Sequence, residues 1–207
     1  MNDTHHTCSD KPSIRNSTKW LLGIGIGAIV IGQNLLRNRN RRDLRDKVVL
    51  ITGGSRGLGL ALAHEFAGKG VRLALCARDE ENLNIAASDL RHSGCEVLTV
   101  SADLRDEKQA AEMIQTVIAH YGTLNVLVNN AGVMLVGPEN VLDTEDYKQV
   151  MEANFWSAFY TTQASLPHFQ KQKQGSIVNI GSIGGKIAVP HMLPYSVSKF
   201  ALVGYSQ

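Results

Sequence analysis

The sequence has few of the residues from which metal centres, disulfide frameworks and nucleic-acid surfaces are built. Its three cysteines, Cys8, Cys76 and Cys95, are odd in number and lack metal-ligand spacing, so we expect free thiols in a reducing compartment. The seven histidines show no ligand pattern. Residues 48–207 carry twelve Lys and Arg against fifteen Asp and Glu, and this net charge of −3 argues against a nucleic-acid surface there.

Positive charge is concentrated before residue 48, where the sequence contains nine Lys and Arg and only four Asp and Glu. Residues 1–19 are polar and aperiodic, which predicts disorder. Residues 20–36 are uncharged, and as a helix they would span ~25 Å, just short of a hydrocarbon core. The basic linker 37–45 follows, so a membrane anchor would leave the body in the cytoplasm. Three interpretations stay open: a single-span anchor, a surface-lying helix, or a soluble tail that packs on a partner.

From residue 46 onward, short apolar runs alternate with helical patterns. The first unit is an apolar run at 48–51, a glycine-rich turn and a helical pattern at 60–67. Further strands are predicted at 71–76, 96–100, 125–132 with its turn, and 175–182, and helices at 79–93, 106–121, 143–170 and from Tyr195. Such alternation predicts an α/β fold with a doubly wound parallel sheet, in which ligands bind beyond the C-terminal ends of the strands.

The first turn has the composition of an anion site. Glycines let the backbone approach a pyrophosphate, and the following helix N-terminus offers unpaired N–H groups and partial positive charge. The spacing of its glycines differs from the common Gly-x-Gly-x-x-Gly fingerprint, and an ordinary tight turn is the alternative. The residues that we predict to contact the nucleotide here are Thr52, Gly53, Ser55, Arg56, Gly57, Leu58 and Gly59.

Five motifs in order resemble the short-chain dehydrogenase/reductase family. They are Thr52-Gly-x-x-x-Gly-x-Gly59, Asn129-Asn-Ala-Gly132, Asn154, Ser182 and Tyr195-x-x-x-Lys199. The resemblance covers residue 46 to the end, and it implies a Rossmann-type domain at 46–207 that binds a nicotinamide cofactor. Family members continue with further strands and loops, so we expect the chain, which ends at Gln207, to be a fragment or an incomplete gene model, with C-terminal strands missing.

The resemblance also assigns catalytic roles. Tyr195 would pass a proton to or from the substrate oxygen, which Ser182 would hold, and Lys199 would bind the nicotinamide ribose. Residues four apart share one face of a helix, and a neighbouring ammonium stabilises a phenolate that otherwise forms only near pH ~10. Asn154 would kink its helix and hold a water that relays protons to Lys199. An exposed helical pair is the alternative interpretation of Tyr195 and Lys199 alone.

Two further segments are predicted to bind the cofactor. By resemblance, Asn129 would pack over the adenosine ribose, while Ala131 and Gly132 would let the backbone approach the nucleotide. Asn130 is included in the same site, although a plain turn role stays open for it. Asp103, with Leu104 beside it, would accept a hydrogen bond from the adenine amino group; a helix N-cap is the alternative role for Asp103.

The second strand favours NADPH over NADH. Enzymes that prefer NAD place a carboxylate after this strand to bind the ribose 2′-hydroxyl. Here Ala77 occupies that position, and Arg78 and Arg56 are placed to pair with a 2′-phosphate. Asp79 follows, and we expect it to cap the next helix.

Together these features predict a membrane-tethered NADPH-dependent carbonyl reductase or alcohol dehydrogenase acting on a small molecule, and the membrane tether favours an apolar one. The alternative hypothesis is a catalytically inactive nucleotide-binding or scaffold protein. The resemblance further implies a homodimer or homotetramer that pairs through the helix at 143–170 and the helix that begins at Tyr195.

Overall fold

The structure is a computed structural model that describes residues 43–207. The predicted disordered segment 1–19, the apolar helix 20–36 and most of the basic linker 37–45 lie outside the described residues. Within residues 43–207, no helix has both the length and the apolar character needed to cross a membrane. Residues 44–207 form one unit of the structure.

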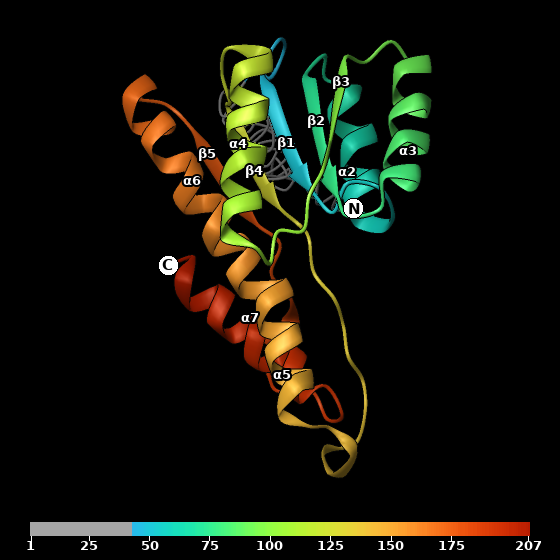
Figure 1. Cartoon of the computed structure of the whole chain (residues 1–207), viewed down its shortest axis with the longest axis vertical. Coiled ribbons are helices and arrows are strands. Elements are labelled where there is room, and N and C mark those ends of the chain that lie inside the picture. The colour runs from blue at the N-terminus through green and yellow to red at the C-terminus, as the bar shows by residue number, and fades with distance from the viewer. Residues whose placement is uncertain (1–42) are drawn as a thin grey trace, which may run out of the picture. The chain divides into compact units, whose positions relative to one another are not determined.

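A five-stranded parallel sheet forms the centre of this unit (Figure 1). Its strands are β1 (Val48–Thr52), β2 (Arg72–Ala77), β3 (Val97–Ser101), β4 (Val126–Asn129) and β5 (Ser176–Asn179), in the order β3-β2-β1-β4-β5. Every neighbouring pair is parallel. The chain therefore runs from β1 outward to β2 and β3. It then returns to form β4 on the other side of β1 and continues outward to β5, which confirms the predicted doubly wound sheet. Its switch point, where such folds bind ligands, lies between β1 and β4.

Helices cover both faces of the sheet, because β1 is apolar along its whole length. Val48 and Leu50 join the core beneath α4 (Glu107–Tyr121) and α6 (Ser157–Gln172), while Val49 and Ile51 join the core beneath α2 (Gly57–Ala67) and α3 (Glu80–His92). All four side chains are fully buried. Burying such a side chain contributes about 1.5–3 kcal/mol, so this strand anchors both layers.

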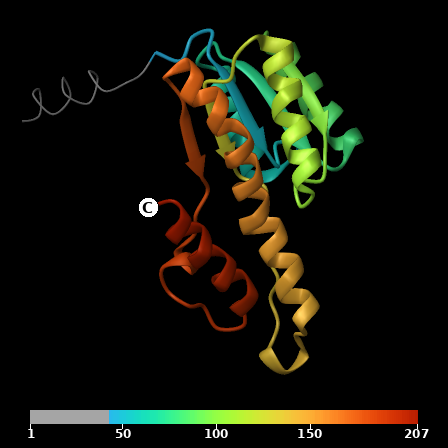
Figure 2. The ribbon, with the colours of Figure 1, turned by 60° about the vertical axis from the view of Figure 1, so that its left-hand side comes forward.

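The predicted helix at 143–170 is interrupted in the structure. It consists of α5 (Thr144–Met151), a π-helical turn η2 (Glu152–Trp156) and α6. Figure 2 shows these pieces as one long rod that continues past the C-terminal ends of the strands. A short 3₁₀ helix η1 (Glu139–Val141) precedes the rod.

The last helix, α7 (Leu193–Tyr205), packs against α5 and the π turn beyond the end of the sheet (Figure 1). The strand before it, β5, is shorter than the predicted 175–182, since the chain leaves the sheet after Asn179. It then forms the 3₁₀ helix η3 (Ile183–Gly185), which packs on α7. This path brings residues that follow β5 to the same end of the sheet as the glycine turn after β1.

Candidate active site

The glycine turn between β1 and α2 needs glycine for two different reasons. Gly53 and Gly57 have φ angles of +65° and +57°, in the left-handed region that favours glycine. Gly59 has no room for a side chain, because a Cβ there would lie 2.1 Å from the Gly53 carbonyl oxygen. The turn and the first turn of α2 are thus pressed together at this point.

The N-terminus of α2 differs from those of the three helices that follow it in the chain. The side chains of Asp79, Asp106 and Asp143 accept backbone N–H groups at the starts of α3, α4 and α5. The expected cap role of Asp79 is therefore confirmed. By contrast, Arg56 precedes α2 without a side-chain cap, and the first turn of α2 holds no acidic residue. Its N–H groups and positive dipole end remain available to an anion.

Thr52 fixes the two loops that meet at the switch point. Its Oγ1 accepts the backbone N–H groups of Asn130 and Ala131, both at 3.0 Å. In return, Asn130 Nδ2 donates to the carbonyl oxygens of Thr52 and Gly53, at 2.9 and 3.2 Å. Thr52 is buried and supports the site from behind.

Asn129 is placed differently from the expectation that it covers the adenosine ribose. It is buried, and its amide donates to Thr162 Oγ1 at 3.0 Å and to Asn179 Oδ1 at 2.9 Å, while its Oδ1 accepts from Thr161 at 2.7 Å. These partners belong to α6 and β5, so Asn129 joins the sheet to its covering helix. Its neighbour Asn130 takes the position that faces the cavity.

A cavity of about 680 Å³ lies beyond the C-terminal ends of the strands, a volume typical of ligand sites. The predicted cofactor residues in its lining are Gly53, Ser55, Arg56, Leu58, Arg78, Asp103, Leu104, Asn130, Ala131 and Gly132. Thr52, Gly57, Gly59 and Asn129 are outside this lining and shape the elements around it. Ser182, Tyr195, Lys199 and Asn154 are also outside the lining.

Arginines dominate the end of the cavity that follows β2. Arg56 and Arg78 both line it, and Ala77, the last residue of β2, adds no carboxylate. Asp79 is next in the chain, but its carboxylate binds the backbone and side chain of Asn82, which with the charge of Arg56 hold the pKa of Asp79 below its usual range. This end of the cavity is therefore suited to an anionic group.

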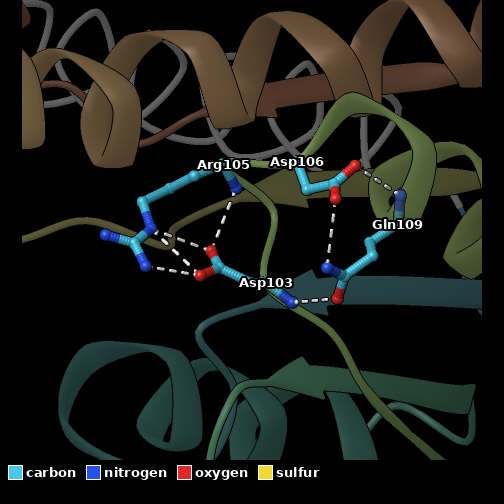
Figure 3. A network of polar contacts seen from close by, with 4 residues as sticks. All are labelled: Asp103, Arg105, Asp106 and Gln109. Carbon is cyan, nitrogen blue, oxygen red and sulfur yellow. Dashed lines mark hydrogen bonds and ion pairs between the residues drawn. The ribbon is translucent and has the colours of Figure 1, made fainter.

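Asp103, the residue before Leu104, also lines the cavity, and Figure 3 shows the contacts of its carboxylate. It does not cap α4, since Asp106 fills that role. The carboxylate instead binds Arg105, whose Nε lies 3.0 Å from both oxygens and whose Nη2 lies 2.6 Å from Oδ2. These hydrogen bonds and the positive charge of Arg105 lower the pKa of Asp103. Sequence reasoning missed Arg105, because only the folded loop shows that it turns back.

Tyr195 and Lys199 lie one turn apart in α7. Lys199 is buried, with 6% of its surface exposed, and its Nζ donates to the carbonyl oxygen of Ile180 at 2.9 Å. The same Nζ lies 5.8 Å from the centre of the Tyr195 ring. Burial disfavours the charged ammonium and so lowers the pKa of Lys199. The helix thus holds a desolvated cation beside a phenol.

Ser182 approaches Tyr195 through the η3 turn. Its Oγ accepts the backbone N–H of Gly184 at 3.1 Å. A Cβ at Gly184 would lie 3.2 Å from the Tyr195 ring and 3.6 Å from Ser182 Oγ, so both side chains border the same small glycine. The structure therefore brings together the three residues Ser182, Tyr195 and Lys199.

Asn154 lies in the π turn and is almost completely buried. Its Oδ1 accepts from Val133 N at 2.7 Å, and its Nδ2 donates to Val133 O and to Ser198 Oγ, both at 2.9 Å. Ser198 in turn donates to the carbonyl oxygen of Tyr195 at 2.7 Å. The break in the helix was expected at Asn154, whereas the link through Ser198 was not. No sequence signal singles out Ser198.

The same asparagine connects α7, which carries Tyr195 and Lys199, to the cavity. Gly132 and Val133 line the cavity, and a Cβ at Gly132 would lie 2.8 Å from Asn154 Oδ1. One continuous set of contacts therefore runs from the loop after β4, through the π turn, to α7. The arrangement can hold an anionic, nucleotide-sized ligand at one end and exchange a proton at Tyr195 at the other.

Comparison with known proteins agrees with this geometry. The chain is 40% identical over 165 residues to 11-beta-hydroxysteroid dehydrogenase 1A of Arabidopsis thaliana, a match that covers 79% of this chain and 47% of that protein. A short-chain dehydrogenase/reductase from Burkholderia phymatum, solved in complex with NAD, is 29% identical with a TM-score of 0.78 over 80% of this chain and 59% of that one. An actinorhodin polyketide ketoreductase, solved with NADPH, is 36% identical with a TM-score of 0.75 over 77% and 62%.

The chain thus spans about half the length of the plant relative. The profile of the short chain dehydrogenase family matches residues 47–207, which is most of the chain and includes all five motifs. The chain belongs to the short-chain dehydrogenase/reductase family.

Proposed function

We propose that the protein is an oxidoreductase that transfers hydride between a nicotinamide cofactor and a carbonyl or alcohol group. The buried Lys199 beside Tyr195 carries this proposal, because a desolvated cation stabilises the phenolate that accepts a proton from an alcohol. When bound, a nicotinamide dinucleotide supplies or receives the hydride. Tyr195 then gives or takes the proton at the substrate oxygen, and Ser182 orients that oxygen by a hydrogen bond.

The cavity residues fit a nicotinamide dinucleotide. The uncapped N-terminus of α2 and the glycine turn suit its pyrophosphate, and the carboxylate of Asp103 suits the adenine amino group. Arg56 and Arg78, with Ala77 in place of an acid, favour a 2′-phosphate, so we propose NADPH as the preferred cofactor. Relatives solved with NAD and with NADPH leave this preference to be decided by the residues of this chain.

Replacing Arg78 tests the cofactor preference. Arg78→Ala should weaken NADPH binding by about 10- to 150-fold, since a charge-assisted hydrogen bond contributes about 1.5–3 kcal/mol, and should leave NADH binding nearly unchanged. Lys69→Ala is the control, because it removes one exposed positive charge outside the cavity lining. An unchanged ratio of the two affinities in Arg78→Ala would refute the preference for NADPH.

Turnover tests the reaction itself. We expect the protein to consume NADPH with members of a ketone panel that includes steroids and aromatic polyketides, because its relatives are named as a hydroxysteroid dehydrogenase and a ketoreductase. Tyr195→Phe should lower the rate by roughly 10²–10⁴-fold, the contribution of general acid–base catalysis, and should retain NADPH binding. NADPH binding with no turnover of any ketone or alcohol would favour the scaffold hypothesis instead.

We further propose that residues 20–36 anchor the protein to a membrane, with the body on the cytoplasmic side. The support is the uncharged run followed by the basic linker 37–45. Deleting residues 20–36 should move the protein from the membrane fraction to the supernatant of cell lysates. Equal distribution of both forms would refute the anchor.

We also propose that two copies pair through α6 and α7. Trp156, the last residue of the π turn before α6, and Val197 and Phe200 on α7 expose 39%, 42% and 45% of their surfaces, so both elements present apolar surface to a second copy. Light scattering should show a dimer or tetramer that Phe200→Glu converts to a monomer. A monomeric wild-type protein would refute this pairing.

A further inference from the structure

The Asp103–Arg105 pair occupies most of the hydrogen-bonding capacity of the Asp103 carboxylate. Besides the guanidinium contacts, the backbone N–H of Arg105 donates to Asp103 Oδ1 at 3.1 Å. Oδ1 therefore accepts from Arg105 N and Nε, and Oδ2 accepts from Nε and Nη2. The single Nε–H is shared between the two oxygens, so three N–H groups of one residue occupy a carboxylate that has about four acceptor sites.

The backbone of this loop is held independently of the pair, as Figure 3 shows. Asp103 N donates to Gln109 Oε1 at 2.9 Å, and Gln109 is fixed in turn by its bonds to Asp106 at the start of α4. The position of the Asp103 backbone therefore does not depend on the guanidinium. Arg105 can leave the carboxylate without displacing the loop.

Arg105 is also partly exposed to solvent. Its side chain is 38% exposed, and both it and Asp103 line the cavity. The pair is partly solvated, so the energy that holds it closed is small, at most that of a good surface ion pair. Hydrogen bonding to Asp103 and its charge raise the pKa of Arg105, and the charge of Glu152 adds a smaller effect, so the released guanidinium has a second carboxylate to attract it.

We propose that Arg105 is a latch on the adenine end of the cavity, whose guanidinium competes with the 6-amino group of the cofactor for the Asp103 carboxylate. This inference rests on the proposed nicotinamide cofactor. Arg105 thereby sets the affinity and the base selectivity of the site, because only a base that offers a donor to Asp103 compensates for the opened ion pair. A base with a carbonyl in that position offers Asp103 no donor, so the Asp103–Arg105 pair stays closed when that base binds.

The test compares NADPH with its deamino analogue, in which hypoxanthine replaces adenine and a ring carbonyl replaces the amino group. Arg105→Lys keeps the positive charge but loses the planar fork, so it frees acceptor sites on Asp103. Arg105→Gln removes the charge as well. Arg91→Lys is the matched control, because Arg91 donates to the Val97 carbonyl outside the cavity lining.

Dissociation constants from fluorescence titration of the full chain give the readout, expressed as the ratio of deamino-NADPH to NADPH. The latch predicts that this ratio rises about 2- to 5-fold in both Arg105 variants, the range of a surface ion pair, and stays unchanged in Arg91→Lys. Asp103→Asn should reduce the ratio toward one. A change in general stability or overall charge would alter both ligands alike and would leave the ratio constant.

The outcomes separate the latch from the proposed cofactor. If the wild-type protein binds neither ligand, the proposed function fails, and the latch with it. If the wild type binds NADPH but the ratio is unchanged or lower in both Arg105 variants, the cofactor assignment stands and the latch is refuted. A lower ratio would mean that Arg105 positions Asp103 for adenine rather than competing with it.

Discussion

Adding one methyl group at Gly59 tests the geometry of the anion site. In Gly59→Ala, the new Cβ would lie 2.1 Å from the Gly53 carbonyl oxygen and 2.6 Å from Asn130 Nδ2. Atoms of these kinds need more than 3 Å, so the start of α2 and the glycine turn have to separate by about 1 Å. The close approach that we assign to pyrophosphate binding is then lost.

The expected loss of stability can be estimated from three terms. Overpacking against backbone costs about 1–3 kcal/mol, and weakening the bond from Asn130 Nδ2 to the Gly53 carbonyl costs about 1 kcal/mol. The better helix propensity of alanine returns up to about 1 kcal/mol. The free energy of unfolding should therefore fall by about 2 kcal/mol, which corresponds to a decrease in Tm of roughly 4–8 °C for a domain of this size.

Gly68→Ala is the matched control at the other end of the same helix. Gly68 has φ −63°, and a Cβ there would meet no atom closer than 3.7 Å. Alanine fits this backbone, so it should be neutral or should stabilise by about 0.4–1 kcal/mol. Thermal unfolding followed by circular dichroism, and NADPH titration, measure both variants. The reasoning is refuted if Gly59→Ala matches wild type in Tm and in NADPH affinity.

Three further predictions concern buried groups. Asn129→Ala should lower the free energy of unfolding by about 2–3 kcal/mol, because it leaves buried hydrogen-bonding partners in α6 and β5 unsatisfied. Urea titration measures this loss, and an effect on NADPH affinity alone would contradict it. Burial raises the pKa of Cys76 to about 12, so iodoacetamide should label Cys76 at mildly alkaline pH only after unfolding, as peptide mass spectrometry can show. Rapid labelling of the native protein would contradict it. Since burial lowers the pKa of Lys199 below 10.5, the unfolded chain binds more protons than the folded chain between the two pKa values. The Tm of wild type should therefore rise with pH in that window relative to Lys199→Met, and a parallel pH dependence would argue against it.

Much of the fold follows from local sequence. The predicted strand at 48–51 ends one residue short of β1, and the apolar run fixes burial on both faces without further information. The π turn could not be placed in this way. It depends on contacts of Asn154 with Val133 and Ser198, which lie 21 and 44 residues away in the chain. Such contacts exist only once α7 has packed.

The alternation of side chains along β4 could have predicted that Asn129 is buried and that Asn130 lines the cavity. Successive side chains in a strand point to opposite faces. Leu127 belongs to the core beneath α4 and α6, so Asn129, two residues later, faces the same helices. The alternation of β4 therefore contained the signal. The Asp103–Arg105 pair has no comparable signal, because a loop side chain chooses its partner only in the folded structure.

Transfer of deuterium from the cofactor tests the central claim most directly. NADPH with deuterium in both C4 positions of the nicotinamide would be incubated with the wild-type protein and the ketone panel. Mass spectrometry would then measure the molecular masses of the products. The account predicts an alcohol that has gained one deuterium, and roughly 10²–10⁴-fold less of it from Tyr195→Phe in the same time. A wild-type protein that binds NADPH and yields no labelled alcohol from any ketone would contradict hydride transfer.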